Sequence, residues 1–208
     1  PRMNFFAHFV VARGLDRDDD ACLGAMLPDL LPMCGARLDT APASVSTGIA
    51  LHHRTDAVFH ADADFVRLNA SGRRALMDDG VRRGPALAVA HVGVELLLDG
   101  WLSDQRPHVH AFERTLSTLP SLRWREPDGA QRLAQLCRRL LAIDVPRRYA
   151  DPSAVTEALH RMLASRPRLA LRSAELAPIE TWLRRVQPTV SQVGPRLVAD
   201  LGTTLTDA

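Results

Sequence analysis

Apolar residues recur along most of the chain at the three- and four-residue spacing of amphipathic helices. Runs in which apolar and polar residues alternate between turn pairs are missing, so nothing in the pattern indicates a sheet. In the first half, the pattern predicts helices at about residues 4–12, 20–31, 46–61, 62–79 and 85–102. The last of these is apolar on all sides, which is typical of a helix buried at the centre of a bundle.

Turn and cap residues mark the ends of these helices. Asp18 or Asp19 is a suitable cap for the second helix, which we expect to be interrupted near Pro28. Residues 35–44 contain glycine, proline and serine and predict a loop.

Prolines are frequent in the second half, where we expect them to separate shorter helices. The clearest amphipathic stretches there are residues 130–143 and 153–163, and Asp151 followed by Pro152 is a typical helix start. No repeat or low-complexity tract is present. The sequence therefore predicts an all-α fold, a single-domain bundle of about eight to ten helices over residues 1–208.

Composition supports a globular protein and excludes several classes. Of 208 residues, 46% are apolar and 24% are charged, and the net charge is only +2, so nothing calls for nucleic acid as a partner. No apolar run approaches the roughly 18–20 residues of a membrane span. The first residues lack the pattern of a signal peptide, and Met3 is the expected start. Three cysteines without a CxxC pair are expected to be reduced thiols, which favours the cytoplasm.

Basic charge is distributed unevenly. Residues 104–208 are arginine-rich, whereas acidic residues outnumber arginines in residues 1–103, and all 26 basic residues are arginine. We interpret this as a compositional bias. The alternative is an acidic or phosphorylated partner that meets pairs such as Arg138-Arg139 and Arg147-Arg148.

Residues that can bind metal occur at helical spacing in the third predicted helix. His52, Asp56 and His60 are four residues apart, so their side chains stack on one face. Imidazole combined with carboxylate is a ligand set that favours Mn²⁺, Fe²⁺ or Zn²⁺ over Ca²⁺.

The fifth predicted helix repeats this spacing with His91, Glu95 and Asp99. Burial of an unpaired carboxylate costs several kcal/mol, so Glu95 among valines and leucines requires an arginine, a neutral histidine or a metal ion as its partner. One buried His–Glu pair is commonplace, but two such helices in one small domain favour a metal site.

Two more polar residues lie in apolar surroundings upstream, namely His8 and Asp29. Taken singly, His8 is typical of a core histidine and Asp29 of a helix-end cap. Together with the pairs above they complete a set for one or two divalent ions with positions left for water, which suits hydrolysis at phosphorus. The candidate ligands are His8, Asp29, His52, Asp56, His91 and Glu95.

Several motifs carry a resemblance to a known family. They are Met3-Asn4-Phe5-Phe6-Ala7-His8, Gly24-Ala25-Met26-Leu27-Pro28-Asp29, Gly48-Ile49 followed by His52-His53-Arg54-Thr55-Asp56, and Met162 to Leu169. In these segments the chain resembles the acyl carrier protein phosphodiesterases, helical relatives of the HD-domain metal-dependent phosphohydrolases. The resemblance spans most of the chain.

The resemblance implies an HD-domain-like fold, a divalent metal such as Mn²⁺, and hydrolysis of a phosphodiester. The named activity removes the 4′-phosphopantetheine arm from the serine of acyl carrier protein, so that protein becomes the expected partner. His8, Asp29, His52 and Asp56 match positions expected to be functional.

The fifth helix departs from the family pattern. The family has Asp-x3-Asp-His there, whereas this chain has His91-x3-Glu95-Leu96. Two ligand-type residues remain and the following histidine is lost, so the chain is expected to be a divergent member.

Three residues of the third predicted helix are candidates for catalysis. The guanidinium of Arg54 matches phosphate oxygens, which makes it the expected phosphate contact. His53 and His60 are candidate acid/base groups, with solvent exposure as the alternative for both.

Two other functions remain open from the sequence. One is a non-catalytic helical protein with buried His–carboxylate pairs or a structural metal site. The other is a phosphodiesterase of the zinc phospholipase C type, which shares only the ligand chemistry.

Overall fold

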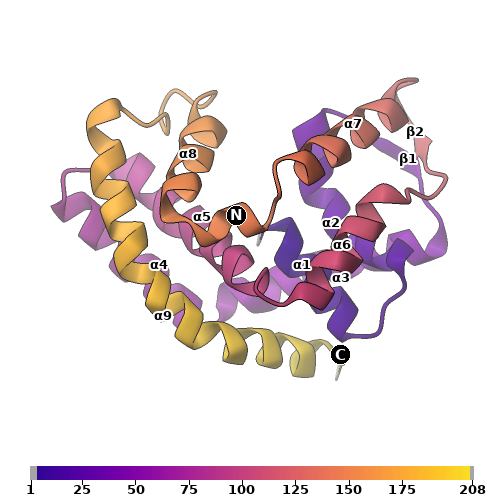
Figure 1. The fold of residues 1–208 in the computed structure, drawn as a ribbon, viewed down its shortest axis with the longest axis horizontal. Coiled ribbons are helices and arrows are strands. Elements are labelled where there is room, and N and C mark those ends of the chain that lie inside the picture. Colours follow the sequence, from indigo (N-terminus) through magenta and orange to yellow (C-terminus); the bar gives the residue numbers. More distant parts are fainter. Residues whose placement is uncertain (1–3, 207–208) are drawn as a thin grey trace.

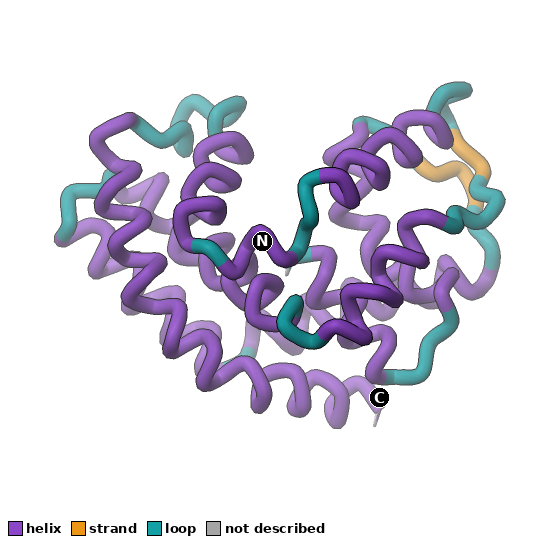
Figure 2. The backbone as a smooth tube through the Cα atoms, viewed as in Figure 1, coloured by secondary structure: helices purple, strands orange, loops and turns teal. Residues whose placement is uncertain are grey.

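The computed structural model describes residues 4–206, so the expected start at Met3 lies outside the described residues. In this part of the chain the helices are α1 (Phe5–Gly14), α2 (Asp19–Cys34), α3 (Ala43–Ala61), α4 (Ala63–Asp78), α5 (Arg83–Leu102), α6 (Arg106–Ser117), α7 (Gly129–Ala142), η1 (Arg147–Ala150), α8 (Pro152–Leu163) and α9 (Ser173–Thr206). The strands are β1 (Leu38–Thr40) and β2 (Arg123–Trp124) (Figures 1 and 2). The predicted all-α fold with eight to ten helices is confirmed.

Helix α2 is longer than the sequence pattern predicts. Asp18 caps it by accepting a hydrogen bond from the Ala21 amide at 2.7 Å, and Gly35 ends it in the left-handed conformation with φ 64°. The expected interruption near Pro28 is wrong, because α2 continues through both Pro28 and Pro32. Its face from Ala21 to Leu27 is buried, and this packing outweighs the loss of backbone donors.

The expectation that prolines interrupt helices is also wrong in the C-terminal region. Pro178, Pro188 and Pro195 were expected to separate helices, but all three lie within the 34-residue helix α9. Figure 1 shows α9 bending along its course, as helices do at proline. Its buried side chains, such as Trp182 and Leu183, fix it to the bundle.

A small ribbon forms where the sequence predicts only a loop. Strands β1 and β2 pair antiparallel, with Leu38 opposite Trp124. Glu126 fixes the adjoining loops, because its carboxylate accepts hydrogen bonds from the Arg37 amide (2.8 Å) and the Arg37 guanidinium (2.7 Å). Strands this short leave no alternating pattern to detect.

The helices gather in two groups (Figure 1). Helices α1, α2, α3, α6 and α7 form one, whereas α4, α5, α8 and the first part of α9 form the other. Contacts of α1 with α5, and of α3 with α4 and α9, join the groups. Helices from residues 1–103 and from residues 104–208 are therefore interleaved, and all candidate ligands come from the first of these halves.

Helix α5 lies at the junction and is almost wholly apolar. It is also long and apolar enough for a membrane span, contrary to the estimate from apolar runs. In this protein 72% of its most apolar 18-residue stretch is buried, as in the core helix of a globular protein. The apolar composition of α5 alone is therefore weak evidence for a membrane span. The buried acids Glu95 and Asp99 lie on this helix.

Two glycines allow α2 and α3 to approach each other closely. A Cβ atom at Gly24 would lie 2.1 Å from the Val45 carbonyl oxygen, and one at Gly48 would lie 2.0 Å from the Ala21 carbonyl oxygen. Any side chain at either position would push the helices apart. This close contact holds the candidate ligands of α3 against α2.

A partly buried ion pair between Arg82 and Glu175 joins the start of α5 to the start of α9. Glu175 is 5% exposed and accepts hydrogen bonds from the Arg82 guanidinium and amide and from the Arg172 amide, at 2.8–3.0 Å. The Arg82 side chain, together with the backbone donors, lowers the pKa of Glu175 to about 2. The ionised form is therefore stabilised in the folded state.

We expect Glu175→Gln to lower the free energy of unfolding at pH 7 by about 2 kcal/mol, because Arg82 loses its charged partner. Glu175 has a folded pKa below its ordinary value of 4.5, so its contribution is complete above that value and is lost as pH falls toward about 2. Urea denaturation from pH 7 to pH 2.5 should show the two proteins converging. The control is Glu180→Gln, which breaks an exposed pair with Arg184 and should change stability by less than about 0.5 kcal/mol. A constant difference at all pH values would contradict the assignment.

Candidate metal centre

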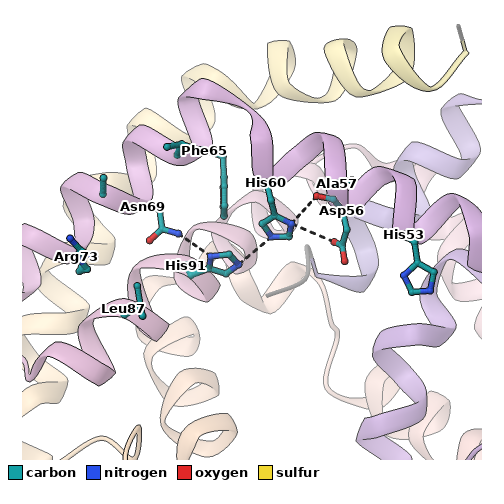
Figure 3. A pocket seen from close by; sticks show the side chains of 11 residues that line it. His53, Asp56, Ala57, His60, Phe65, Asn69, Arg73, Leu87 and His91 are labelled. Atoms are coloured by element: carbon teal, nitrogen blue, oxygen red, sulfur yellow. Dashed lines mark hydrogen bonds and ion pairs between the residues drawn. The ribbon is translucent and has the colours of Figure 1, made fainter. Parts of the chain in front are cut away.

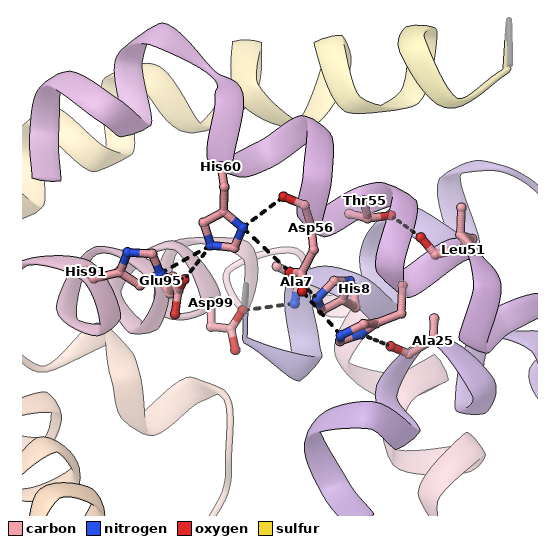
Figure 4. Close-up of polar contacts among 11 residues, drawn as sticks. Ala7, His8, Ala25, Leu51, Thr55, Asp56, His60, His91, Glu95 and Asp99 are labelled. Carbon is pink, nitrogen blue, oxygen red and sulfur yellow. Dashed lines mark hydrogen bonds and ion pairs between the residues drawn. The ribbon is translucent and has the colours of Figure 1, made fainter. Parts of the chain in front are cut away.

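Helix α3 supplies ligand-type side chains to two neighbouring clusters. The first cluster, triad 1, consists of His8 from α1 with His52 and Asp56 from α3. Asp56 Oδ1 lies 3.3 Å from His8 Nε2, and Asp56 Oδ2 lies 3.5 Å from His52 Nε2 (Figure 4). The two imidazole rings stack with centroids 3.7 Å apart. Both histidines are fully buried, whereas the Asp56 side chain is 15% exposed.

The backbone of α2 determines which nitrogen of His52 carries its proton. His52 Nδ1 lies 2.8 Å from the Ala25 carbonyl oxygen, which can only accept a hydrogen bond. Nδ1 therefore donates, and Nε2 of the neutral ring presents a lone pair toward Asp56. Burial, followed by the nearby charge of His8, lowers the pKa of His52 to about 3, so the ring is neutral at physiological pH.

The second cluster, triad 2, consists of His60 from α3 with His91 and Glu95 from α5. Glu95 Oε1 lies 3.2 Å from His60 Nε2 and 2.9 Å from His91 Nε2. The two Nε2 atoms are 3.2 Å apart (Figures 3 and 4). Glu95 is 2% exposed, and the histidines are partly exposed. Helices α3 and α5 thus converge on one point.

His60 belongs to triad 2 and also contacts Asp56 of triad 1. Its Nδ1 lies 2.8 Å from the Asp56 carbonyl oxygen and 3.9 Å from Asp56 Oδ1, while its Nε2 faces Glu95 and His91, the other members of triad 2. Burial acts to lower the pKa of His60, but the hydrogen bond and charge of Glu95 outweigh burial, and the pKa is raised. Glu95 therefore stabilises the protonated form of the His60 ring.

Asp99 lies outside both triads and fixes the start of α1. Its Oδ1 accepts a hydrogen bond from the Ala7 amide at 2.9 Å, and its Oδ2 accepts one from the Asn4 side chain. Complete burial raises the pKa of Asp99 to about 8, despite these donors. The contact with Ala7 holds α1 against α5 next to His8.

A cavity of about 700 Å³ opens onto the exposed edges of both triads (Figure 3). Asp56, His60 and His91 line one part of it, whereas Asn69 and Arg73 of α4 line another. Its remaining lining is His53, Ala57, Phe65, Val66, Ala70 and Leu87. Small molecules can therefore reach carboxylate, imidazole and guanidinium groups in a single cavity.

Comparison with known proteins decides the family. Residues 3–193 match the family described as acyl carrier protein phosphodiesterase. The chain belongs to the acyl carrier protein phosphodiesterase family. Membership implies a hydrolase of phosphodiester bonds and confirms the resemblance seen in the sequence. Searches of curated proteins and of solved structures found no match.

The structure brings most of the predicted ligands together within this family member. His8, His52 and Asp56 form triad 1, and His91 and Glu95 belong to triad 2. Asp29 joins neither triad: it is half-buried on α2, one turn beyond Ala25, and its role as a ligand stays a prediction.

The candidate catalytic residues have different surroundings. His60 contacts Glu95 and His91 within triad 2. His53 is exposed and lines the cavity (Figure 3), and its ring lies edge-on to the ring of His52 in triad 1, with centroids 5.3 Å apart. Arg54 is exposed and is not part of the cavity lining. The roles of His53 and Arg54 in catalysis stay predictions.

Sequence reasoning missed two polar residues of the cavity. Asn69 Nδ2 lies 2.9 Å from His91 Nδ1, and Arg73 lines the same wall. Phe65, Asn69 and Arg73 are four residues apart, so they share one face of α4. The spacing that reveals His52, Asp56 and His60 could also have revealed this face.

The donor set fits a divalent transition metal. Each triad offers two imidazole nitrogens and one carboxylate oxygen, and the ligand atoms of each lie within 4.8 Å of one another. His52 is neutral, with its bare nitrogen directed into triad 1, as metal ligation requires. Nitrogen-rich sets of this kind favour Mn²⁺, Fe²⁺ or Zn²⁺ over Ca²⁺ and Mg²⁺.

Proposed function

We propose that this protein hydrolyses the phosphodiester that joins 4′-phosphopantetheine to acyl carrier protein, with a divalent metal ion held by His8, His52 and Asp56. The observation that carries the proposal is the position of Asp56, whose carboxylate lies between two buried histidines and also lines the 700 Å³ cavity. Family membership supplies the reaction class.

The ion, when bound, would polarise a phosphoryl oxygen and activate water for attack at phosphorus. The protein's own contribution is to keep the ligands in position. Ala25 holds the proton of His52 on Nδ1, so that Nε2 remains free to ligate. Asp99, through Ala7, fixes the helix that carries His8.

Three further side chains would bind the phosphate or transfer a proton, and two of them line the cavity. Arg73 lines the cavity one helical turn beyond Asn69 on α4 and would bind the non-bridging phosphate oxygens (Figure 3). Arg54 is exposed on α3 and is not part of the cavity lining, and it would contact the phosphate or the carrier protein. His53 lines the cavity next to His52 of triad 1 and would give a proton to the departing serine oxygen.

The cavity also suits the arm that must be released. Val66 and Leu87 are exposed large apolar side chains, and both line the cavity that Arg73 also lines. Phosphopantetheine combines a phosphate with a long, largely uncharged chain. An anionic end near Arg73 and an apolar wall along the chain match that combination.

The test is release of phosphopantetheine from holo-acyl carrier protein, measured by mass spectrometry with Mn²⁺ added. We expect release by the wild-type protein, and we expect Arg73→Gln to reduce kcat/KM by about 10- to 100-fold through loss of the phosphate contact. The matched control is Arg74→Gln, its exposed neighbour, which does not line the cavity. Absence of release with Mn²⁺, Fe²⁺ and Zn²⁺ alike would refute the substrate assignment, and equal activity of both variants would refute the role of Arg73.

A further inference from the structure

Triad 2 has the dimensions of a metal-binding face. Its three ligand atoms, His60 Nε2, His91 Nε2 and Glu95 Oε1, form a triangle with edges of 3.2, 3.2 and 2.9 Å. Bonds of about 2.0–2.2 Å to a common ion place neighbouring ligand atoms about 2.8–3.6 Å apart at octahedral or tetrahedral angles. We propose that triad 2 binds a divalent transition-metal ion of its own, separate from the ion assigned to triad 1.

The distribution of protons in triad 2 leaves room for a cation. His60 Nδ1 faces the Asp56 carbonyl oxygen, which can only accept, so Nδ1 carries a proton, and Nε2 of the neutral ring carries a lone pair. That lone pair points at Glu95 Oε1, another acceptor. Two acceptors 3.2 Å apart repel each other unless a proton or a metal ion lies between them. A metal ion supplies that charge and at the same time binds His91.

A metal-binding histidine needs a hydrogen-bond partner at its other ring nitrogen, and Asn69 is in position to be that partner for His91. Its amide lies 2.9 Å from His91 Nδ1, with the NH₂ group toward the ring. For His91 Nε2 to ligate, the proton must move to Nδ1, and Asn69 must present its oxygen. Rotation of the terminal amide by about 180° exchanges its oxygen and nitrogen and meets this requirement, because the two atoms occupy equivalent positions. Outer partners of this kind fix the tautomer of metal-binding histidines.

Triad 2 is open on the side that an additional ligand needs. His60 and His91 both line the cavity, while Glu95 closes the buried side. An ion held by these three residues would keep positions open toward the cavity for water or an anionic oxygen. Two imidazoles and one carboxylate match Zn²⁺, Co²⁺ or Fe²⁺.

The two ion sites can be counted without measuring turnover. Protein depleted with EDTA is titrated with Zn²⁺, and bound metal is measured by mass spectrometry after desalting. We expect two ions per chain for the wild-type protein and one each for Glu95→Gln and Asp56→Asn. Glu180→Gln, which alters only an exposed pair on α9, should still bind two. Circular dichroism checks that each variant is folded, and His91→Gln, at a less buried position, replaces Glu95→Gln if that variant does not fold.

The outcomes separate this proposal from the proposed function. One ion in both wild-type protein and Glu95→Gln would overturn the second site and leave a protonated His60–Glu95 pair only, with the ion of triad 1 unaffected. No ion at all would overturn both assignments. Two ions together with no release of phosphopantetheine would support the second site and refute the substrate.

Asn69 provides an independent test. Asn69→Leu should weaken binding of one of the two Zn²⁺ ions by about 10- to 100-fold, because His91 loses its outer partner. Asn69→Asp should retain binding, since a carboxylate accepts the Nδ1 proton. A purely structural role would make both variants bind as the wild type does. The visible absorption of Co²⁺ bound at triad 2 should change in Asn69→Leu, and an unchanged spectrum would contradict the role of Asn69.

Discussion

Replacement of Asp56 by asparagine is expected to remove the triad 1 ion and with it nearly all turnover. Asp56 is the single carboxylate of triad 1, within 3.3 Å of His8 and 3.5 Å of His52. A neutral amide is a much weaker ligand, so the loss of kcat/KM should exceed the 10- to 100-fold that removal of an outer partner costs. Turnover of bis-nitrophenyl phosphate and the Mn²⁺ content of the purified variant measure the effect.

The substitution leaves the local backbone unchanged, which makes the test specific. The Asp56 carbonyl that accepts the His60 Nδ1 proton belongs to the main chain and is retained in the variant. The control is Asp39→Asn, at an exposed carboxylate on β1, which should keep both activity and metal. Full turnover by Asp56→Asn would exclude triad 1 as the catalytic centre.

Gly48→Ala is expected to destabilise the protein strongly, by about 3 kcal/mol in the free energy of unfolding. The added methyl group would lie 2.0 Å from the Ala21 carbonyl oxygen and 2.8 Å from the Ala25 amide nitrogen. Both atoms belong to the backbone of α2, so the two helices must separate. That shift also displaces the Ala25 carbonyl from His52, and metal affinity should fall together with stability.

The sign of this effect distinguishes packing from helix propensity. Alanine is favoured over glycine within a helix by about 1 kcal/mol, so without the clash the variant would be more stable than the wild type. Gly14→Ala is the control, because nothing lies within 4 Å of a Cβ atom there. Urea denaturation followed by circular dichroism compares the two variants. A gain of stability in Gly48→Ala would show that α2 and α3 are not in close contact.

The positions of helices could be predicted from the sequence, but their continuity could not. Helices α3, α4 and α5 appear near their predicted bounds, because caps and apolar spacing are local signals. Prolines misled the prediction in α2 and α9, since burial against distant helices decides whether a helix survives a missing donor. The ribbon of β1 and β2 depends on residues far apart in sequence and leaves no local pattern.

The residue types of the candidate site could be predicted from the sequence, but their division between two triads could not. Helical spacing identified five of the residues that form the triads, namely His52, Asp56, His60, His91 and Glu95. It could not show that His60 turns away from His52 and joins α5, because that depends on how the helices cross. Asn69 escaped notice because an amide does not itself suggest a metal site.

Because of the order of the ligands along the chain, triad 1 is complete earlier in synthesis than triad 2. Triad 1 draws on α1 and α3, whereas triad 2 must wait for α5. A ribosome adds about 5–20 residues each second, so roughly 40 residues separate the two events by several seconds. Under the proposed assignments, a nascent chain would bind the triad 1 ion before triad 2 exists, and that ion would hold α1 against α3 while α5 is still being made.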